Sequence, residues 1–347
     1  MSTTTGTPTG TPAPTTATGG LALALRRYPE LMVAAVLLVA VVVIGTINPV
    51  FWQPANLFSL LRASVITGIL GLAVMMVMLS GGIDVSFPAF AIAAMYLTVK
   101  AMIAWGFDGV LLPFLMATAI GTGLGLVNAV FVYYFRMIPL IVTLGTGTAV
   151  RGFILGVVGT SQINIDQMPP LLINFARGEF LHVTQGDGST AGLSSMVLVY
   201  AAIAVLVHLM LRHTMMGRSI YALGGGEEAA RRVGFNVRRT TFFIYGLAGA
   251  LAGFAGLLHG AMIWTANPRD MVGLELDVIA AVVLGGASIF GGRGSVIGTV
   301  LGGLTLVVIT NSLIILGVDT TWQRVVVGLI VIAATAATAW RDRKRLA

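Results

Sequence analysis

Hydrophobic residues occur along this chain in long runs rather than in alternation with polar residues. A helix needs roughly 20 apolar residues to cross a bilayer, whereas membrane strands show alternating segments of about ten. The pattern therefore predicts an all-α, polytopic integral membrane protein with about ten transmembrane helices. The predicted spans cover residues 31–47, 61–80, 86–105, 110–134, 138–158, 193–211, 241–263, 276–290, 295–316 and 322–340.

Two glycine pairs interrupt this pattern. Ser80-Gly81-Gly82 separates the second and third runs, and Gly291-Gly292 separates the eighth and ninth. Glycine pairs permit irregular backbone, which membranes tolerate only where protein or water surrounds it. Broken or re-entrant pieces are therefore expected at both places. The two similar junctions are also compatible with an internal duplication, which is common in transporters.

Composition supports a membrane protein. The 347 residues are 57% hydrophobic and 10% charged, against about a quarter charged in soluble domains. The sequence contains no cysteine, which excludes disulfides and thiolate chemistry. We expect residues 1–25, rich in Thr, Pro and Gly, to form a disordered cytoplasmic tail, and residues 26–347 to form a single permease domain. No basic segment of the kind that begins a signal peptide precedes the first run, which is therefore read as a retained span.

The net charge of +7 reflects topology. With both termini in the cytoplasm, 14 of the 20 Lys and Arg residues lie on the inner side and five on the outer side, as the positive-inside rule requires. We therefore discard a nucleic-acid partner. The same orientation predicts an outer loop at about 159–192, which either meets a solute-delivery protein or is a plain connector.

The largest inner loop, at about 212–240, carries the most informative pattern. Residues 227–233 are good helix formers with acids in the first turn and arginines in the last, which suits the helix dipole. Gly224 to Gly226 are expected to turn sharply before this helix and Gly234 to end it. Such a short helix is marginal alone, so it either docks on a partner or is a solvated connector.

Seven residues are candidates for the solute path, of which two are the glycines Gly81 and Gly82 and five are charged or polar. Asp84, next to Gly81 and Gly82, is a costly carboxylate near hydrocarbon. It and Ser86 either line the path or cap the helix that follows. We expect Arg151, which lies inside a span, either to contact the solute or to hold two helices together through a carboxylate or a carbonyl. The eighth span begins with two acids, Glu275 and Asp277. Acids suit a helix N-terminus, and the alternative is a role at the mouth of the path.

Catalytic and metal-binding patterns are missing from the sequence. The four histidines are scattered, and no Gly-x-x-x-x-Gly-Lys-Ser/Thr loop is present. Any ATP-driven activity therefore needs a separate subunit, with ATP and magnesium on that partner and no cofactor on this chain. The glycines at 246, 249, 253, 256, 298 and 302 are expected to mark close helix packing.

Three ordered motifs carry a resemblance. They read Gly-Gly-Ile-Asp-Val-Ser at 81–86, Tyr-Ala-Leu-Gly-Gly-Gly-Glu-Glu-Ala-Ala-Arg at 221–231, and Glu-Leu-Asp-Val-Ile-Ala-Ala-Val-Val-Leu-Gly-Gly-Ala-Ser at 275–288. From about residue 30 to 340 the chain resembles the ribose/xylose-type ABC importer permeases, which are related to branched-chain amino-acid permeases. In that family Asp-Leu-Ser-Val-Gly is usual where this chain has Asp84-Val85-Ser86-Phe87-Pro88, a difference in the expected path lining.

The resemblance implies a bacterial inner-membrane complex of two permeases, identical or paralogous, with ATPase subunits on the cytoplasmic face and a periplasmic or lipid-anchored solute-binding protein. It implies alternating access for a monosaccharide or sugar-like solute. The alternative is a secondary transporter or channel that works alone. Residues that match the family's ATPase-coupling helix and its flanks are Gly224, Gly225, Glu227, Glu228, Ala229, Ala230, Arg231 and Gly234.

Overall fold

The computed structural model describes residues 29–186 and 188–319, together with residues 322, 325, 326, 328, 329 and 332. The tail predicted at 1–25 and most of the span predicted at 322–340 lie outside the described residues. In chain order the elements are α2 (Pro29–Ile47), η1 (Pro49–Trp52), α3 (Pro54–Leu79), α4 (Phe87–Trp105), α5 (Leu111–Tyr134), α6 (Pro139–Phe153), η2 (Ile154–Val158), α7 (Pro170–Arg177), β1 (Glu179–Thr184), β2 (Thr190–Ser194), α8 (Met196–His213), α9 (Met215–Gly225), α10 (Glu227–Arg232), α11 (Val237–Ile263), α12 (Leu274–Leu284) and α13 (Val296–Ile315).

The described residues form eight helices that are long and apolar enough to cross a membrane, which confirms the predicted all-α polytopic class. They correspond to the first seven predicted spans and the ninth. The second begins at Pro54 rather than at residue 61, because proline suits the first turn of a helix. The eight segments are Glu30–Ile47, Pro54–Leu79, Phe87–Trp105, Leu111–Tyr134, Pro139–Val158, Met196–His213, Val237–Ile263 and Val296–Ile315.

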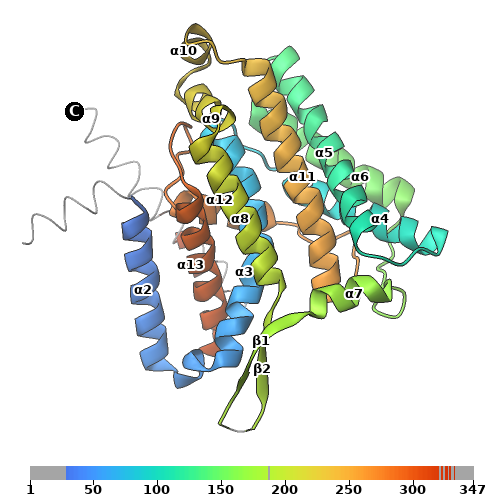
Figure 1. The fold of residues 1–347 in the computed structure, drawn as a ribbon, viewed down its shortest axis with the longest axis vertical. Coiled ribbons are helices and arrows are strands. Elements are labelled where there is room, and N and C mark those ends of the chain that lie inside the picture. The colour runs from blue at the N-terminus through green and yellow to red at the C-terminus, as the bar shows by residue number, and fades with distance from the viewer. Residues whose placement is uncertain are drawn as a thin grey trace, which may run out of the picture.

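Two long helices, α3 and α11, form the centre of the bundle. The most apolar window of α3 is 78% buried and that of α11 is 72% buried, whereas the corresponding window of α2 is 11% buried. Figure 1 shows α3 and α11 in the middle, with α2 at one side and α5 and α6 at the other. The outer helices expose long apolar faces, which lipid would cover.

Glycines let α11 approach its neighbours with backbone against backbone. A Cβ on Gly249 would overlap the carbonyl oxygen of Gly121 in α5, and a Cβ on Gly256 would overlap that of Ala91 in α4. The predicted role of this glycine series in close packing is confirmed at these positions. Gly246 differs, because it faces the side chain of Leu126.

The eighth predicted span, 276–290, is not a single transmembrane helix, and the broken piece expected near Gly291-Gly292 lies between α12 and α13. Helix α12 has 11 residues, which is about 16 Å of helix and too short for a bilayer. It ends where Gly286 takes a φ of 89°, and an irregular segment then leads to α13. Gly285 packs so tightly on Gly298 that neither can carry a Cβ without overlap. Glycine at both positions is therefore required for this close approach of the end of α12 to α13.

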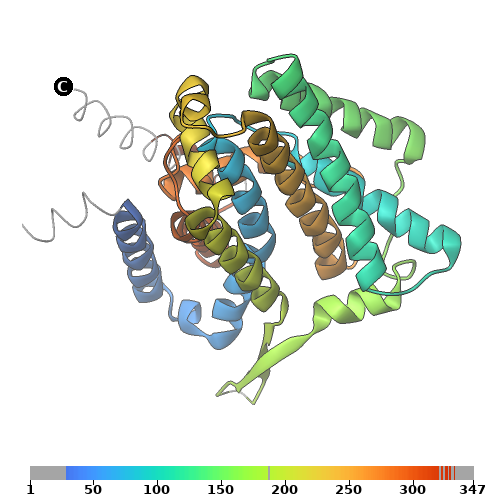
Figure 2. The same ribbon diagram turned by 45° about the horizontal axis from the view of Figure 1, so that its top comes forward.

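The two ends of the bundle differ in character. One end, which we call the arginine-rich end, carries α9 and α10. The other, the hairpin end, carries α7 and the antiparallel pair β1–β2, which is paired from Glu179 with Ser194 to Thr184 with Thr190. Figures 1 and 2 show the hairpin projecting from the bundle opposite α10. The arginines that belong to the first end are Arg136, Arg212, Arg218, Arg231, Arg232, Arg238, Arg239 and Arg293.

Candidate functional site

Helix α10 is the short helix that the sequence predicted. It begins after Gly226, which has a φ of 139°, and it ends before Gly234, which has a φ of 87° and donates its amide to the carbonyl of Arg231. The predicted sharp turn over Gly224–Gly226 is wrong in part, because Gly224 and Gly225 are the last residues of α9 and Gly226 alone makes the turn. The helix is therefore a separate rod joined to α9 by one residue.

The charged side chains of α10 divide between two faces. Glu227 and Arg231 form one i,i+4 ion pair of 2.6 Å and are about half exposed. Glu228 and Arg232 form a second pair of 3.5 Å and are 88% and 82% exposed. Ala230 is buried and fixes the helix to the body of the protein. The outward face thus presents one acidic and one basic group to solvent, in a fixed order along the helix.

Three glycine-containing segments meet directly behind α10. The amide of Gly292 donates a 2.9 Å hydrogen bond to the carbonyl oxygen of Leu79. A Cβ on Gly224 would overlap both of these groups, and a Cβ on Gly291 would lie 2.8 Å from the Cα of Gly81. We call this contact the glycine junction, made of residues 79–82, 224–225 and 291–292. It joins the end of α9 to the two breaks in the membrane helices, which are the irregular segments between α3 and α4 and between α12 and α13.

The junction changes the interpretation of two predicted path residues. Gly81 and Gly82 lie beside α9 at the arginine-rich end. Tyr221 of α9 strengthens the same contact, because its hydroxyl donates a 2.9 Å hydrogen bond to the carbonyl of Gly294. Sequence reasoning missed this convergence, although the two similar glycine pairs were its visible sign.

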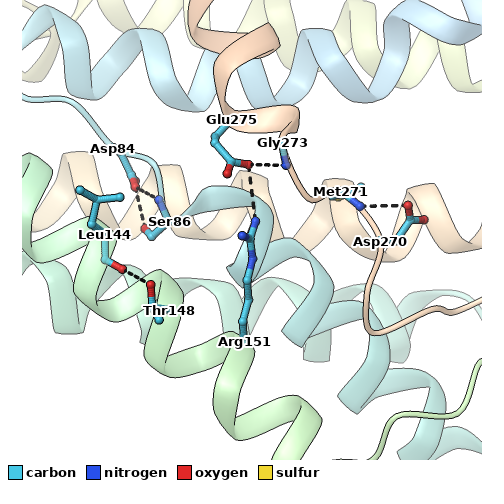
Figure 3. A network of polar contacts seen from close by, with 9 residues as sticks. All are labelled: Asp84, Ser86, Leu144, Thr148, Arg151, Asp270, Met271, Gly273 and Glu275. Carbon is cyan, nitrogen blue, oxygen red and sulfur yellow. Dashed lines mark hydrogen bonds and ion pairs between the residues drawn. The ribbon is translucent and has the colours of Figure 1, made fainter. Parts of the chain in front are cut away.

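Asp84 belongs to a buried polar network that crosses three elements. Its Oδ1 accepts hydrogen bonds from the amide and the hydroxyl of Ser86, at 2.7 and 2.6 Å (Figure 3). The amide nitrogen of Asn128 in α5 donates to the Ser86 hydroxyl at 2.9 Å. Thr146 in α6 donates to Asn128 Oδ1 at 2.7 Å. The network fixes the break between α3 and α4 against α5 and α6.

This network replaces the helix cap that the sequence suggested. Ser86 occupies the N-cap position of α4 but makes no side-chain capping bond there. Its hydroxyl oxygen instead accepts from Asn128 of α5, and its proton is donated to Asp84. Asn128 and Thr146 were not identified from the sequence. An asparagine in the middle of an apolar span was the available signal.

Arg151 contacts a carboxylate on another helix, which is one of the two roles that the sequence predicted for it. Its Nη2 lies 3.5 Å from Oε2 of Glu275, which also accepts a 3.1 Å hydrogen bond from the amide of Gly273. Figure 3 shows the arginine reaching from α6 toward the start of α12. Glu275 and Asp277 both lie in the first turn of α12, as predicted. The ion pair therefore connects α6 to the short helix.

A second polar contact at the hairpin end was not predicted. His259 Nε2 lies 2.8 Å from Asp270 Oδ2. Asp270 Oδ1 accepts a hydrogen bond from the amide of Met271, as Figure 3 shows. The hydrogen bond from His259 lowers the pKa of the Asp270 carboxyl below its ordinary value. Among the described residues no group of three His, Cys, Asp or Glu side chains is placed to hold a metal ion.

A cavity of about 570 Å³ opens at the arginine-rich end. It lies between α10, the turn from α5 to α6, residues 80–82 of the glycine junction and the first turns of α11. Its polar lining includes Tyr133, Arg136, Glu227, Arg231, Thr241 and Tyr245.

Comparisons with known proteins cover most of the chain. Residues 56–335 match the family described as the permease component of branched-chain amino acid transport systems. The chain is 34% identical to the ribose import permease protein of Escherichia coli strain K12 over 86% of its own length and 90% of that protein. It is 36% identical to the ribose import permease protein of Bacillus subtilis strain 168, over 90% and 92%. It is 30% identical to the D-allose transport system permease protein of Escherichia coli strain K12, over 87% and 89%.

Proposed function

Because this chain belongs to the family of branched-chain amino acid transport system permease components, we propose that it is the membrane-spanning subunit of an ATP-binding-cassette importer for a monosaccharide or sugar-like solute. The solute class follows from relatives whose names specify ribose and D-allose. The chain lies in a bacterial inner membrane with its arginine-rich end in the cytoplasm, as the positive-inside rule requires.

The placement of α10 is the observation that carries this proposal. The helix stands at the arginine-rich end, and its outward pair Glu228–Arg232 is almost fully exposed. Through Gly224 the preceding helix α9 contacts Leu79 and Gly292, which lie at the two breaks in the membrane helices. A partner ATPase that holds α10 therefore has a direct mechanical connection to the membrane segments. ATP and magnesium belong to that partner.

The outer face of α6 supports a path shared with a second permease, either another copy or a paralogue. Thr148 is exposed on this span, and the Cβ positions of Gly145 and Gly152 face open space. The Thr148 hydroxyl donates to the carbonyl of Leu144 on its own helix, so its exposure is compatible with lipid, and the small and polar positions of this face also suit a water-filled path. Arg151, on the same helix, is partly exposed beside Glu275 and so lies where solute hydroxyls can reach it.

Alternating access follows from these parts. ATP binding draws the partner ATPases together and moves α10, the glycine junction shifts the broken helices, and the path opens toward the hairpin end. A solute-binding protein delivers its ligand there, on the surface formed by α7 and the β1–β2 hairpin. Hydrolysis returns the path to the cytoplasmic side. Specificity is then shared between the binding protein and a path with few polar groups.

The test reverses charge on the outward face of α10. Glu228→Arg should reduce co-purification of the ATPase and solute-stimulated ATP hydrolysis. The swap Glu228→Arg with Arg232→Glu keeps an i,i+4 pair and so separates docking from helix stability. Full uptake and coupling in both variants would refute docking. Solute movement in liposomes that contain this chain alone, driven by an ion gradient, would instead identify a secondary transporter.

A further inference from the structure

Two hydroxyl groups of otherwise buried residues open onto the cavity at the arginine-rich end. Thr241 and Tyr245 lie one turn apart on α11, line the cavity, and are 5% and 2% exposed. Within the described part of the chain the structure gives neither hydroxyl a hydrogen bond, whereas the adjacent Thr240 bonds to both Ser219 and the carbonyl of Asn236. Neither oxygen is among the enclosed unpartnered atoms of the described residues, so both are reached from the cavity, where a bound molecule or water is their available partner.

The charges around the cavity limit what this occupant can be. Glu227 and Glu228 are balanced by Arg136 and Arg231, so the ionisable side chains of the lining sum to zero. A strongly charged ligand would therefore gain little net attraction. Carboxylates accept hydrogen bonds, guanidinium groups donate them, and the Thr241 and Tyr245 hydroxyls do both. A neutral polyhydroxylated molecule fits this lining, and the volume of 570 Å³ lies within the usual range for small-molecule sites.

The occupant would touch the parts that move during transport. Glu227 and Arg231 form the α10 wall of the cavity. On the opposite side, the Tyr245 hydroxyl lies 3.2 Å from the position that a Cβ on Gly82 would take, so the ligand would reach the glycine junction. A molecule bonded to both walls holds α10 at a fixed distance from α11 and from the break after α3.

We propose that this cavity is a regulatory site for a neutral monosaccharide on the cytoplasmic side, and that its occupancy holds α10 and slows the transport cycle. Accumulated sugar then restrains its own import. The inference rests on the proposed function for the side of the membrane and the class of solute. The site itself is built from Thr241 and Tyr245 of α11 and from Glu227 and Arg231 of α10.

The experiment uses the complete transporter in proteoliposomes. The binding protein and saturating solute are sealed inside, the ATPases face the bath, and ATP hydrolysis is followed while D-ribose is added to the bath. We expect inhibition at millimolar D-ribose, and no comparable effect from D-ribose 5-phosphate because the lining is neutral. Thr241→Val with Tyr245→Phe should raise the half-inhibitory concentration about tenfold, since two hydrogen bonds are lost. Each rate is compared with that of the same variant without sugar.

A matched control is Tyr200→Phe, which removes a buried tyrosine hydroxyl on α8 outside the cavity and should leave inhibition unchanged. Absence of inhibition at about 10 mM sugar, well above a millimolar dissociation constant, would overturn the regulatory site. Equal inhibition of the wild type and the double variant would also overturn it. In both cases solute-stimulated ATP hydrolysis persists, whereas failure of the proposed function would abolish that hydrolysis in the wild type.

Discussion

The amide of Gly292 donates a 2.9 Å hydrogen bond to the carbonyl of Leu79, so the break after α12 is bonded directly to the end of α3. Gly224 packs against both groups from α9. Backbone packed on backbone has no flexible side chain to absorb a displacement. A movement of α9 and α10 therefore has to displace both breaks together.

Adjacent glycines in α9 allow a sharp test of the junction. Gly224→Ala places a methyl group on the Leu79 carbonyl, whereas Gly225→Ala places it in open space. We expect Gly224→Ala to cost roughly 1–3 kcal/mol of stability and to reduce uptake, as overpacking does. Gly225→Ala should be neutral or slightly stabilising, because alanine favours helix. Thermal unfolding in nanodiscs measures stability, and solute uptake measures transport. Equal stability and equal uptake of the two variants would contradict a tight backbone contact at Gly224.

The buried network around Asn128 should behave as a coupled unit. Asn128→Ala removes the donor to Ser86 and the acceptor of Thr146, which leaves buried groups unsatisfied and should cost roughly 1–3 kcal/mol. Combined with Thr146→Val, the loss should be smaller than the sum of the two single losses. Thr122→Val is the control, because its hydroxyl bonds only within its own helix, to Thr118. Strict additivity in thermal unfolding would show that the network does not act together.

The contact between Arg151 and Glu275 predicts rescue by exchange. Arg151→Glu places two carboxylates together between α6 and α12 and should lower both thermal stability and uptake. The swap with Glu275→Arg restores an ion pair, and part of the stability should return, on the order of 1 kcal/mol for a partly buried pair as long as 3.5 Å. If the swap recovers stability but not uptake, Arg151 serves the solute path as well. No recovery of either would mean that the ion pair is unimportant.

The sequence predicted the parts of this molecule better than their assembly. Long apolar runs identified the spans because a bilayer imposes helix length, and the acidic start and basic end of residues 227–233 identified α10. The meeting of Gly81, Gly224 and Gly291 could not be predicted, because it depends on how distant helices pack. The Ser86 cap was mispredicted for a related reason. Its hydroxyl oxygen accepts from Asn128 of a distant helix rather than from an amide of α4, and only the folded structure decides between such donors.

The His259–Asp270 contact predicts how stability at the hairpin end depends on pH. The pKa of Asp270 is lowered by its hydrogen bond to His259, so the folded state binds this proton less readily than the unfolded chain. The stabilisation is therefore present above the ordinary pKa of 3.8 and is lost as the pH falls through the lower folded value. Because the carboxylate is about a third exposed, we expect less than about 1 kcal/mol.

Asp270→Asn measures this contribution by thermal unfolding in nanodiscs over a pH series. The variant should be less stable than the wild type near neutral pH, and the two should converge as the pH falls through the lowered folded pKa of Asp270, below which both carry a neutral side chain at this position. Asp166→Asn is the control, since it removes an exposed carboxylate from the same end. A stability difference for Asp270→Asn that stays constant down to the acid limit would mean that the carboxylate charge contributes nothing, and that the side chain serves only as a hydrogen-bond acceptor for Met271.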